Sequence, residues 1–330
     1  MKKSQYIFST GTIFRKDNTL CFESEKGKRY FPVEDIKEIF LFGEVDFNKR
    51  FLEFISQKEI LLHIFNHYGY YMGTFYPREH LNSGYMILQQ TQAYLDEKRR
   101  KEIAFKFVQG SMDNMHQVLR YYNNRGTELE DILDQLNTFQ DRLLTCETIE
   151  QMMAIEGNYR EQYYLAFDRI IDQDHFVFEG RSRQPPLNRL NALISFGNSM
   201  VYSIVLSEIY KTHLDPRIGY LHTTNFRGFT LHLDIAEIFK PILVDRVIFT
   251  LLGKKMITAK DFEKKLEGII LNEKGRRTFL EELEKRLATT IKHRELGREV
   301  SYRRLIRMEA YKLQKHIMGE KEYIPYVSRW

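Results

Sequence analysis

The pattern of apolar residues changes once along this chain of 330 residues, and no other feature of the sequence constrains the fold as strongly. Up to about residue 75, short runs of β-branched and aromatic residues alternate with turn-forming residues, which is typical of hairpins. From Tyr85 onward, apolar residues recur with the 3.6-residue period of helices. Between the two patterns, proline, histidine, asparagine, serine and glycine cluster from Pro77 to Gly84. The sequence therefore predicts an α+β fold, with a small N-terminal β-rich domain at 1–80 and a larger all-α domain at 81–330.

The β-rich domain is expected to contain seven strands and one helix. The strands are expected at 6–8, 12–14, 19–22, 29–33, 36–42, 61–65 and 70–75, and the helix at 47–57. In the second domain, the 3.6-residue period predicts helices at 87–108, 128–144, 149–171, 187–213, 235–252, 260–272, 276–295 and 302–317.

Composition excludes several classes of protein. With 43% apolar and 14% aromatic residues, the chain is too hydrophobic to remain disordered. Its two cysteines, Cys21 and Cys146, lie far apart, which argues against a disulfide framework and against a thiolate metal site. The N-terminus has no apolar signal-peptide core, and the apolar run at 241–252 is interrupted by Asp245 and Arg246. We therefore expect a soluble protein of a reducing compartment, the cytoplasm.

Positive charge is concentrated at the C-terminal end. The whole chain has a net charge of +5, whereas 271–330 contains 15 Lys and Arg against 9 Glu and no Asp, a net charge of +6. Such asymmetry suits a polyanion such as DNA, because each phosphate that the protein neutralises releases counterions. On charge alone, a solvated helical surface is an equally good interpretation.

Two segments contain acidic residues on helices that are otherwise apolar. Glu156 lies beside the apolar face of the helix predicted at 149–171, where an ordinary ion pair with Arg160 is the simpler interpretation. Asp234 and Glu237 share one face of a later helix, and Asp234 suits a cap or the first turn, where the helix dipole favours negative charge. Glu237 lies among apolar residues, so it needs a partner, and a divalent cation is one candidate.

His222 lies in the loop before the helix that contains Asp234 and Glu237. A single histidine of this kind is usually a structural residue with a hydrogen-bond partner. By itself, His222 therefore does not indicate a site.

Four groups of residues, in this order and spacing, resemble the motifs of the CRISPR-associated adaptation endonuclease family, Cas-one. They are Glu156-Gly157 followed by aromatic residues; Arg183-Gln184-Pro185-Pro186 leading into 191–197; Gly219-Tyr220-Leu221-His222; and 233–237 followed by 239–241 and 244–246. The similarity covers about 155 to 246, and the β-then-α order and the total length also agree. Asn188 departs from the family, because many relatives have an acidic residue there, but it is suited to cap the helix that follows.

The resemblance implies a catalytic site formed by Glu156, His222 and Glu237, which would also be the ligands of one divalent metal ion, Mg²⁺ or Mn²⁺. Asp234 matches the family's additional acidic position, which implies a supporting or DNA-facing role. Two carboxylates and one imidazole suit either ion, and the nitrogen ligand favours Mn²⁺, while zinc remains open. Such an ion would neutralise charge on a phosphodiester and orient a DNA 3′-hydroxyl or a water for in-line attack.

The same resemblance implies a metal-dependent DNA endonuclease and integrase of CRISPR adaptation, which inserts spacer DNA into the repeat array. It also implies a homodimer, with the β domain contributing to the dimer contact, and assembly with the small Cas-two protein around duplex DNA. The basic residues of the C-terminal helices would contact phosphates: Arg276, Arg277, Lys285, Arg286, Lys292, Arg294, Arg298, Arg303, Arg304 and Arg307.

Two other functions remain open from the sequence. A non-catalytic DNA-binding scaffold would use only the basic helices, and its salt-sensitive DNA binding would not respond to a chelator. A metallohydrolase acting on a small phosphoester would show turnover without affinity for DNA.

Overall fold

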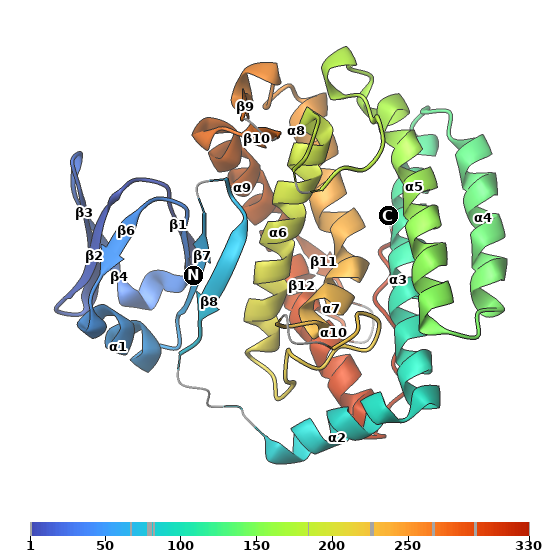
Figure 1. Ribbon diagram of the computed structural model, residues 1–330, viewed down its shortest axis with the longest axis horizontal. Coiled ribbons are helices and arrows are strands. Elements are labelled where there is room, and N and C mark those ends of the chain that lie inside the picture. The colour runs from blue at the N-terminus through green and yellow to red at the C-terminus, as the bar shows by residue number, and fades with distance from the viewer. Residues whose placement is uncertain are drawn as a thin grey trace. The chain divides into compact units, whose positions relative to one another are not determined.

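The structure is a computed structural model that describes residues 2–66, 68–77, 81, 83–183, 185–224, 228–265, 268–293 and 296–329. Contacts divide the chain into two compact units, Met1–Leu81 and Asn82–Trp330. The first unit is rich in strands and the second is mostly helical (Figure 1), so the predicted α+β fold class is confirmed. Part of the boundary segment from Pro77 to Gly84 lies outside the described residues, as do Gln184 and Arg294.

The described residues of the first unit form two four-stranded sheets and one α-helix. One sheet has the order β1-β5-β7-β8, in which β5 pairs in parallel with β1 and β7, and β8 is antiparallel to β7. The other sheet has the order β4-β3-β2-β6. The elements are β1 (Lys3–Ile7), β2 (Gly11–Lys16), β3 (Thr19–Ser24), β4 (Gly27–Pro32), β5 (Ile36–Leu41), β6 (Val45–Phe47), α1 (Lys49–Gln57), β7 (Leu61–Phe65) and β8 (Tyr71–Phe75).

The core of this unit follows from the alternation of apolar residues along its strands. Ile39 and Leu41 of β5 point to one face, where they join a buried cluster with Phe51 and Phe54 of α1 and Leu20 of β3. The helix begins at the Asn48 cap, whose side chain accepts a hydrogen bond from the Phe51 amide at 3.0 Å. One cluster therefore fixes both sheets and α1 together.

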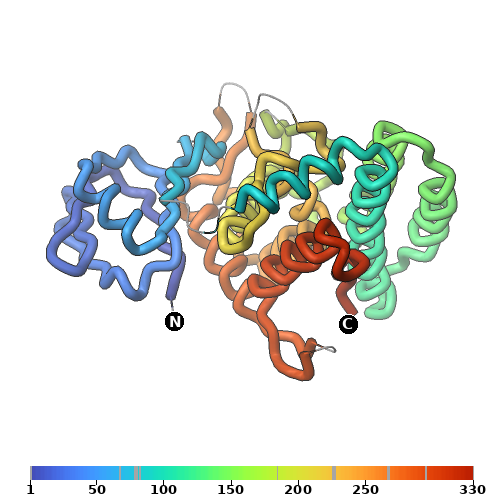
Figure 2. The backbone as a smooth tube through the Cα atoms, turned by 90° about the horizontal axis from the view of Figure 1, so that it is seen from below, coloured from blue at the N-terminus to red at the C-terminus, as the bar shows by residue number. Residues whose placement is uncertain are grey.

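The second unit is a bundle of helices with two small hairpins. Its helices are α2 (Gly84–Leu95), α3 (Glu97–Asn123), α4 (Glu130–Leu144), α5 (Ile149–Ile171), α6 (Arg189–Ile209), α7 (Leu231–Lys240), α8 (Arg246–Gly253), α9 (Glu273–Ala288) and α10 (Tyr302–Ile317). The hairpins are β9 (Phe262–Lys264) with β10 (Ile269–Leu271), and β11 (Thr290–Lys292) with β12 (Glu299–Ser301). Helices α3, α4 and α5 lie side by side (Figures 1 and 2).

Capping residues explain where three helices of this unit begin. Helix α5 begins at Thr148, whose side chain forms a reciprocal capping box with Gln151, and both ends of α5 match the prediction. Helix α3 is separate from α2 because Asp96 caps its first turn and accepts a hydrogen bond from the Arg99 amide. The helix predicted at 187–213 is α6, which begins after the predicted cap Asn188.

The helix predicted at 260–272 is wrong, because this segment forms the β9–β10 hairpin after a short 3₁₀ turn. The Ile269 amide donates to the Pro186 carbonyl oxygen at 2.9 Å, and a Cβ on Gly268 would lie only 2.6 Å from the same oxygen. A distant segment therefore decides the local structure. The helix predicted at 276–295 is also too long, since α9 ends at Ala288 and β11 follows.

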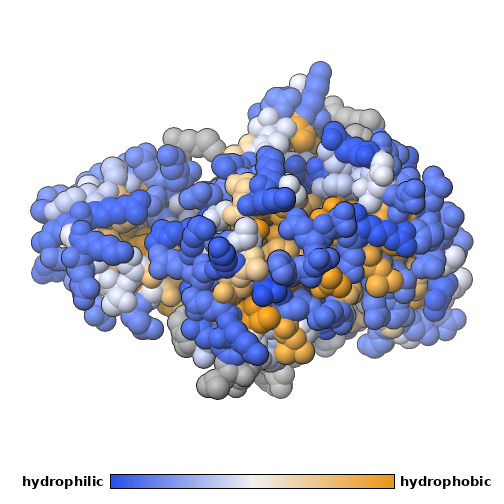
Figure 3. Space-filling model, turned by 90° about the horizontal axis from the view of Figure 1, so that it is seen from above, coloured by the Kyte–Doolittle hydropathy of each residue, from blue (hydrophilic) through white to orange (hydrophobic). Residues whose placement is uncertain are grey.

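Helix α6 lies in the middle of the second unit and contacts α7 and α10 (Figure 1). Gly197 allows close packing here, because a Cβ at this position would lie 2.5 Å from Val244 Cγ1. By length and composition α6 is the one described helix that could cross a membrane, but 78% of its apolar window is buried inside the unit, as in a core helix. On the face shown in Figure 3, hydrophilic side chains cover most of the surface.

Candidate functional site

A buried guanidinium joins the two glutamates that the sequence singled out. Arg160 of α5 donates through Nε to Glu156 Oε1 at 2.8 Å and through Nη2 to Glu237 Oε2 of α7 at 2.6 Å. Nη2 also donates to the Ser111 hydroxyl of α3 at 3.2 Å. Since Arg160 and Glu237 are only 9% and 6% exposed, water does little to screen this contact. Three helices thus meet at one charged cluster.

A second cation contacts Glu237 from its own helix. Lys240 lies one turn further along α7, is buried, and donates through Nζ to Glu237 Oε1. Burial alone would raise the pKa of Glu237, but the positive charges of Lys240 and Arg160 outweigh it and lower that pKa to about 2. Glu237 is therefore ionised at neutral pH, and two cations balance the charge of the buried carboxylates.

His222 is held by a carboxylate that bonds the whole loop before α7. Asp234 Oδ2 accepts from the amides of Tyr220 and Leu221 at 2.6 and 3.1 Å. Asp234 Oδ1 accepts from the His222 amide at 2.9 Å and lies 2.8 Å from His222 Nδ1. Asp234 itself is fully buried. Asp234 thus fixes both the loop and the imidazole. It lies in the first turn of α7, as predicted.

This contact also selects the ring nitrogen that His222 offers to a ligand. Because Nδ1 is paired with Asp234, Nε2 is left for another partner, which is the arrangement that metal-bound histidines use. Burial disfavours the charged ring, but the Asp234 hydrogen bond and the negative charges of Asp234 and Glu237 raise the pKa of His222. The charge of Glu237 thus acts on the His222 ring, although the hydrogen-bond partner of that ring is Asp234.

The three predicted ligands lie in one region but not as a ready-made metal site. Arg160 lies between Glu156 and Glu237, and His222 is directed by Asp234. Within the described ranges, no group of three His, Cys, Asp or Glu side chains is arranged to hold a metal ion. The donor chemistry nevertheless fits a divalent cation, because the residue types are two carboxylates and one imidazole oriented by Asp234, and Arg160 and Lys240 now supply the positive charge beside the carboxylates. The assignment of these ligands stays a prediction.

Sequence reasoning missed the structural role of two basic residues. Arg160 was visible only as the i+4 partner of Glu156, and Lys240 only as part of a motif. The spacing of Lys240 three residues after Glu237 could have indicated a same-face pair. Nothing in the spacing could show that Arg160 also reaches Glu237, since that contact spans 77 positions.

Several of the basic residues expected to contact phosphates are instead used inside the protein. Arg303 and Arg307 of α10 pair with the buried Glu208 of α6, with the closest Arg307 contact at 2.6 Å. Arg286 donates to the Ile242 carbonyl oxygen. These side chains stabilise the bundle. Fewer cations of the C-terminal helices are therefore available to a polyanion than the net charge of this region suggests.

The fold and the site define a class of protein: a β-rich unit followed by a helical unit whose buried carboxylate cluster lies beside an oriented histidine. The solved structure of a Cas1 protein from Thermotoga maritima has the same fold, with a TM-score of 0.90 and 47% sequence identity, over 99% of this chain and 100% of that chain. A casposase bound to an integration product, which is only 20% identical, also shares the fold, with a TM-score of 0.86.

Sequence comparison gives the family directly. The family model described as "CRISPR associated protein Cas1" matches residues 5–285. The chain is 57% identical over 330 residues to a protein named "CRISPR-associated endonuclease Cas1 2" from Thermodesulfovibrio yellowstonii, and the alignment covers all of both chains. The chain belongs to the Cas1 family, so the family resemblance seen in the sequence is confirmed.

Proposed function

We propose that this chain is a divalent-metal-dependent DNA endonuclease and integrase of CRISPR adaptation. It would join spacer DNA to the repeat array by attack of a DNA 3′-hydroxyl on a phosphodiester, with water as the nucleophile in cleavage. Membership of the Cas1 family supports the biological setting. The observation that supports the chemistry is that Arg160 joins Glu156 and Glu237, two carboxylates from different helices, while Asp234 orients His222 in the loop before the same α7.

Glu156, His222 and Glu237 would hold the ion, Mg²⁺ or Mn²⁺. When bound, such an ion neutralises negative charge on a phosphodiester and orients the attacking oxygen. The residues of this chain prepare the site: Asp234 fixes the His222 tautomer, and the cations near Glu237 keep its carboxylate ionised. Glu237 would lose no proton when a cation arrives, whereas His222, whose pKa is raised, must be neutral to act as a ligand, so metal binding should strengthen as the pH rises through the His222 pKa.

The partners of the reaction follow from the family. Duplex spacer DNA and the repeat array would be the substrates, and the Cas-two protein and a second copy of this chain would complete the complex. The unit Met1–Leu81 would contribute to the dimer contact, and Asn82–Trp330 would contain the nuclease and integrase site. The cytoplasm, where the array resides, is the expected location.

A strand-transfer assay with Mn²⁺ tests the proposal. The substitutions Glu156→Ala, His222→Ala and Glu237→Ala are each expected to lower the rate at least about 100-fold, as for a lost catalytic group. Glu161→Ala is the matched control, because Glu161 is exposed on the same helix as Glu156. Undiminished activity in all three variants would exclude the proposed site.

One observation favours a second candidate, a non-catalytic DNA-binding scaffold. Arg160 and Lys240 already neutralise the carboxylates, so the cluster is stable as a purely structural ion-pair network. A scaffold would bind DNA equally well with and without EDTA and would release no product. The strand-transfer assay with and without EDTA therefore distinguishes the two functions.

A further inference from the structure

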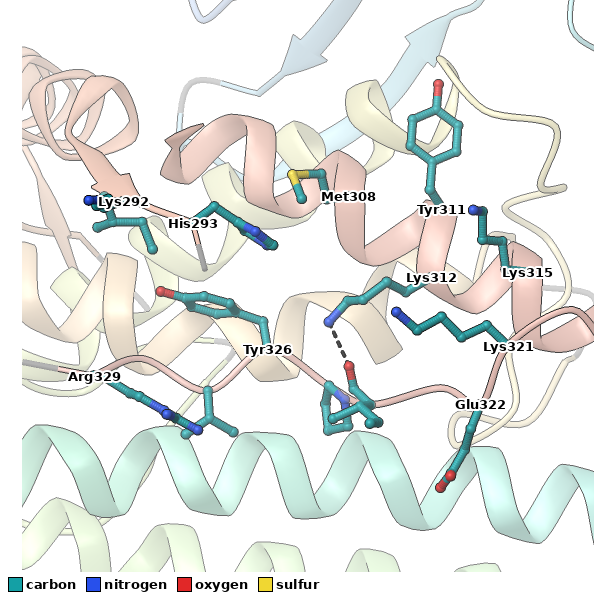
Figure 4. A pocket seen from close by; sticks show the side chains of 14 residues that line it. Lys292, His293, Met308, Tyr311, Lys312, Lys315, Lys321, Glu322, Tyr326 and Arg329 are labelled. Carbon is teal, nitrogen blue, oxygen red and sulfur yellow. Dashed lines mark hydrogen bonds between the residues drawn. The ribbon is translucent and has the colours of Figure 1, made fainter. Parts of the chain in front are cut away.

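The C-terminal segment 319–329 lies against α7, the helix that contains Glu237. It follows α10 and forms no helix or strand over its described residues. Figure 4 shows part of it beside α10, where Lys312 donates to the Ile324 carbonyl oxygen at 2.6 Å. A chain end without secondary structure is poorly ordered unless other groups tie it down. Here buried side chains hold the segment at two anchors.

The first anchor is Glu309 of α10, which is buried. Its Oε1 accepts from the Tyr323 hydroxyl at 2.7 Å and from the Tyr326 amide at 3.1 Å. Lys312 pairs with Glu309 Oε2 at 2.7 Å and so balances the charge of the carboxylate. This anchor fixes the C-terminal segment to the helix that precedes it.

The second anchor is Asn114 of α3, whose side chain is fully buried. Its Oδ1 accepts from the Ser328 amide at 2.8 Å, and its Nδ2 donates to the Tyr326 carbonyl oxygen at 2.8 Å. Nδ2 also donates to the Ile238 carbonyl oxygen of α7 at 3.1 Å, and within α3 to that of Gly110 at 3.0 Å. A side-chain amide can both donate and accept in this way. Asn114 therefore joins α3, α7 and the C-terminal segment.

The end of α7 needs support from outside the helix. A π-helical turn, Pro241–Asp245, follows α7 directly. Because Pro241 has no amide hydrogen, the Glu237 carbonyl oxygen lacks the donor that an α-helix supplies four residues later. The C-terminal segment packs at this point: the Tyr326 ring stacks on Phe239, with ring centroids 6.0 Å apart and planes 4° apart.

Helix α3 also reaches the carboxylate cluster. Ser111 lies three positions before Asn114, and its hydroxyl accepts from Arg160, which in turn donates to Glu237. Helix α3 thus restrains α7 twice, through Asn114 at the Ile238 backbone and through Arg160 at the Glu237 carboxylate. Since a displacement of about 1 Å at a reacting group can cost ~100-fold in rate, a shift of the end of α7 would disturb the site.

We propose that Asn114 is a positioning residue of the site: together with the C-terminal segment, it braces the end of α7 and thereby fixes where Glu237 lies. Asn114 acts on the α7 backbone, so its loss would be felt without any change in a ligand side chain. This inference rests on the proposed function for the role of Glu237 as a metal ligand.

Hydrogen exchange of the full chain without metal tests the brace, because amide exchange measures local opening. The test variant is Asn114→Ala. Tyr326→Ala is a second variant, which removes the ring from Phe239 at a partly exposed position and so keeps the test possible if Asn114→Ala fails to fold. The control is Gln173→Ala, because Gln173 makes a bond of the same kind to α8, donating to the Leu252 carbonyl oxygen at 3.0 Å.

In Asn114→Ala, amides of 231–245 are expected to exchange about 10-fold faster than in the control, as for the loss of one buried hydrogen bond. Amides of α4 should exchange at the same rate in both variants. Tyr326→Ala should change the exchange of 231–245 in the same direction.

Mn²⁺ binding is measured on the same proteins without DNA, by the electron paramagnetic resonance signal of free Mn²⁺. Asn114→Ala should raise the Mn²⁺ dissociation constant at least about 10-fold, the lower end of the effect of losing a supporting partner of a metal ligand. Gln173→Ala should bind Mn²⁺ like wild type. This readout requires no turnover, so it separates a misplaced ligand from a loss of DNA binding.

Three results would overturn the inference: exchange of 231–245 that matches the control, an equal rise throughout the helical unit, or faster exchange of 231–245 with unchanged Mn²⁺ affinity. If wild type binds Mn²⁺ and the Asn114 and Tyr326 variants bind it equally well, the proposed function stands and the positioning role is wrong. If wild type binds no Mn²⁺, the proposed function fails, while a selective rise in α7 exchange still supports the brace.

Discussion

Arg160 donates a hydrogen bond to Glu237 at 2.6 Å, although the two residues lie 77 positions apart on α5 and α7. Arg160 also bonds Glu156, so one guanidinium links both carboxylates of the predicted site. Removing one partner of a buried ion pair leaves an uncompensated charge in a poorly solvated place. The arrangement of the site therefore depends on Arg160 as much as on the carboxylates.

Arg160→Ala is expected to lower the free energy of unfolding by about 3 kcal/mol, because the buried Glu237 keeps only Lys240 as a counter-ion and Glu156 loses its partner. Arg169→Ala on the same helix is the control: its partner Asp131 is exposed, and loss of an exposed pair costs about 1 kcal/mol or less. Urea denaturation measures both. Equal losses in the two variants would show that the buried cluster contributes no more than a surface ion pair.

Lys240→Met should make the site bind Mn²⁺ more strongly. Lys240 occupies Glu237 Oε1, so a metal ion has to compete with it for this oxygen. We expect a variant that is less stable without metal and that gains more in melting temperature when Mn²⁺ is added. The control is Lys211→Met, which removes a lysine from a similar i,i+3 pair with Glu208. A Mn²⁺-induced gain no larger than that of wild type would contradict this competition.

Asp234→Ala should change the tautomer of His222 as well as lower activity. In wild type, the contact at Nδ1 favours a proton on Nδ1 and leaves Nε2 free. Without the carboxylate, nitrogen NMR of the imidazole should detect the Nε2–H form, and strand transfer should fall by about 10- to 100-fold, as for a lost partner of a metal ligand. Asp215→Asn, in the same loop, is the control, because Asp215 pairs with Arg217. An unchanged tautomer would refute the orienting role.

Asp245 predicts a specific dependence of stability on pH. It is buried and accepts a hydrogen bond from the Tyr163 hydroxyl at 3.0 Å. Burial raises its pKa from 3.8 to about 7, although the charge of Arg160 acts in the opposite direction. The pKa of Asp245 is higher in the folded protein than in the unfolded chain. Its protonated form therefore contributes fully to the free energy of unfolding below about pH 4, and this contribution is lost as the pH rises through about 7.

Asp245→Asn mimics the protonated form, so its stability relative to wild type should rise with pH. Between pH 5.5 and pH 8 we expect the difference in unfolding free energy to shift by about 1 to 2 kcal/mol in favour of the variant. Urea denaturation at the two pH values measures it. A difference that stays constant with pH would mean that the pKa of Asp245 is not raised.

The sequence predicted the elements well where local signals decide them. The apolar period predicted the bounds of α5 and α10, and in the structure a capping box at Thr148 and Gln151 fixes the start of α5. It failed at 260–272, where pairing with the distant Pro186 produces a hairpin. Periodicity within a window contains no information on such a contact.

The candidate site, like the fold, could be predicted from the sequence only in part. The family motifs predicted Glu156, His222 and Glu237 as ligands and implied a supporting or DNA-facing role for Asp234, and the ligand assignment stays a prediction. Neither spacing nor composition could show that Arg160 bridges two helices, because that contact exists only after α5 and α7 pack together. The net charge of the last sixty residues can be counted from the sequence. Which of these cations remain available to a ligand depends on internal partners such as Glu208, whose contacts the sequence does not show.

The most direct test of the central claim is a crystal structure of the protein soaked in Mn²⁺, with the metal located by its anomalous scattering. The account predicts one peak bound by Glu156, His222 and Glu237, with Arg160 and Lys240 moved off the carboxylate oxygens. A peak elsewhere, or an unchanged Arg160 bridge with no peak at saturating Mn²⁺, would contradict it.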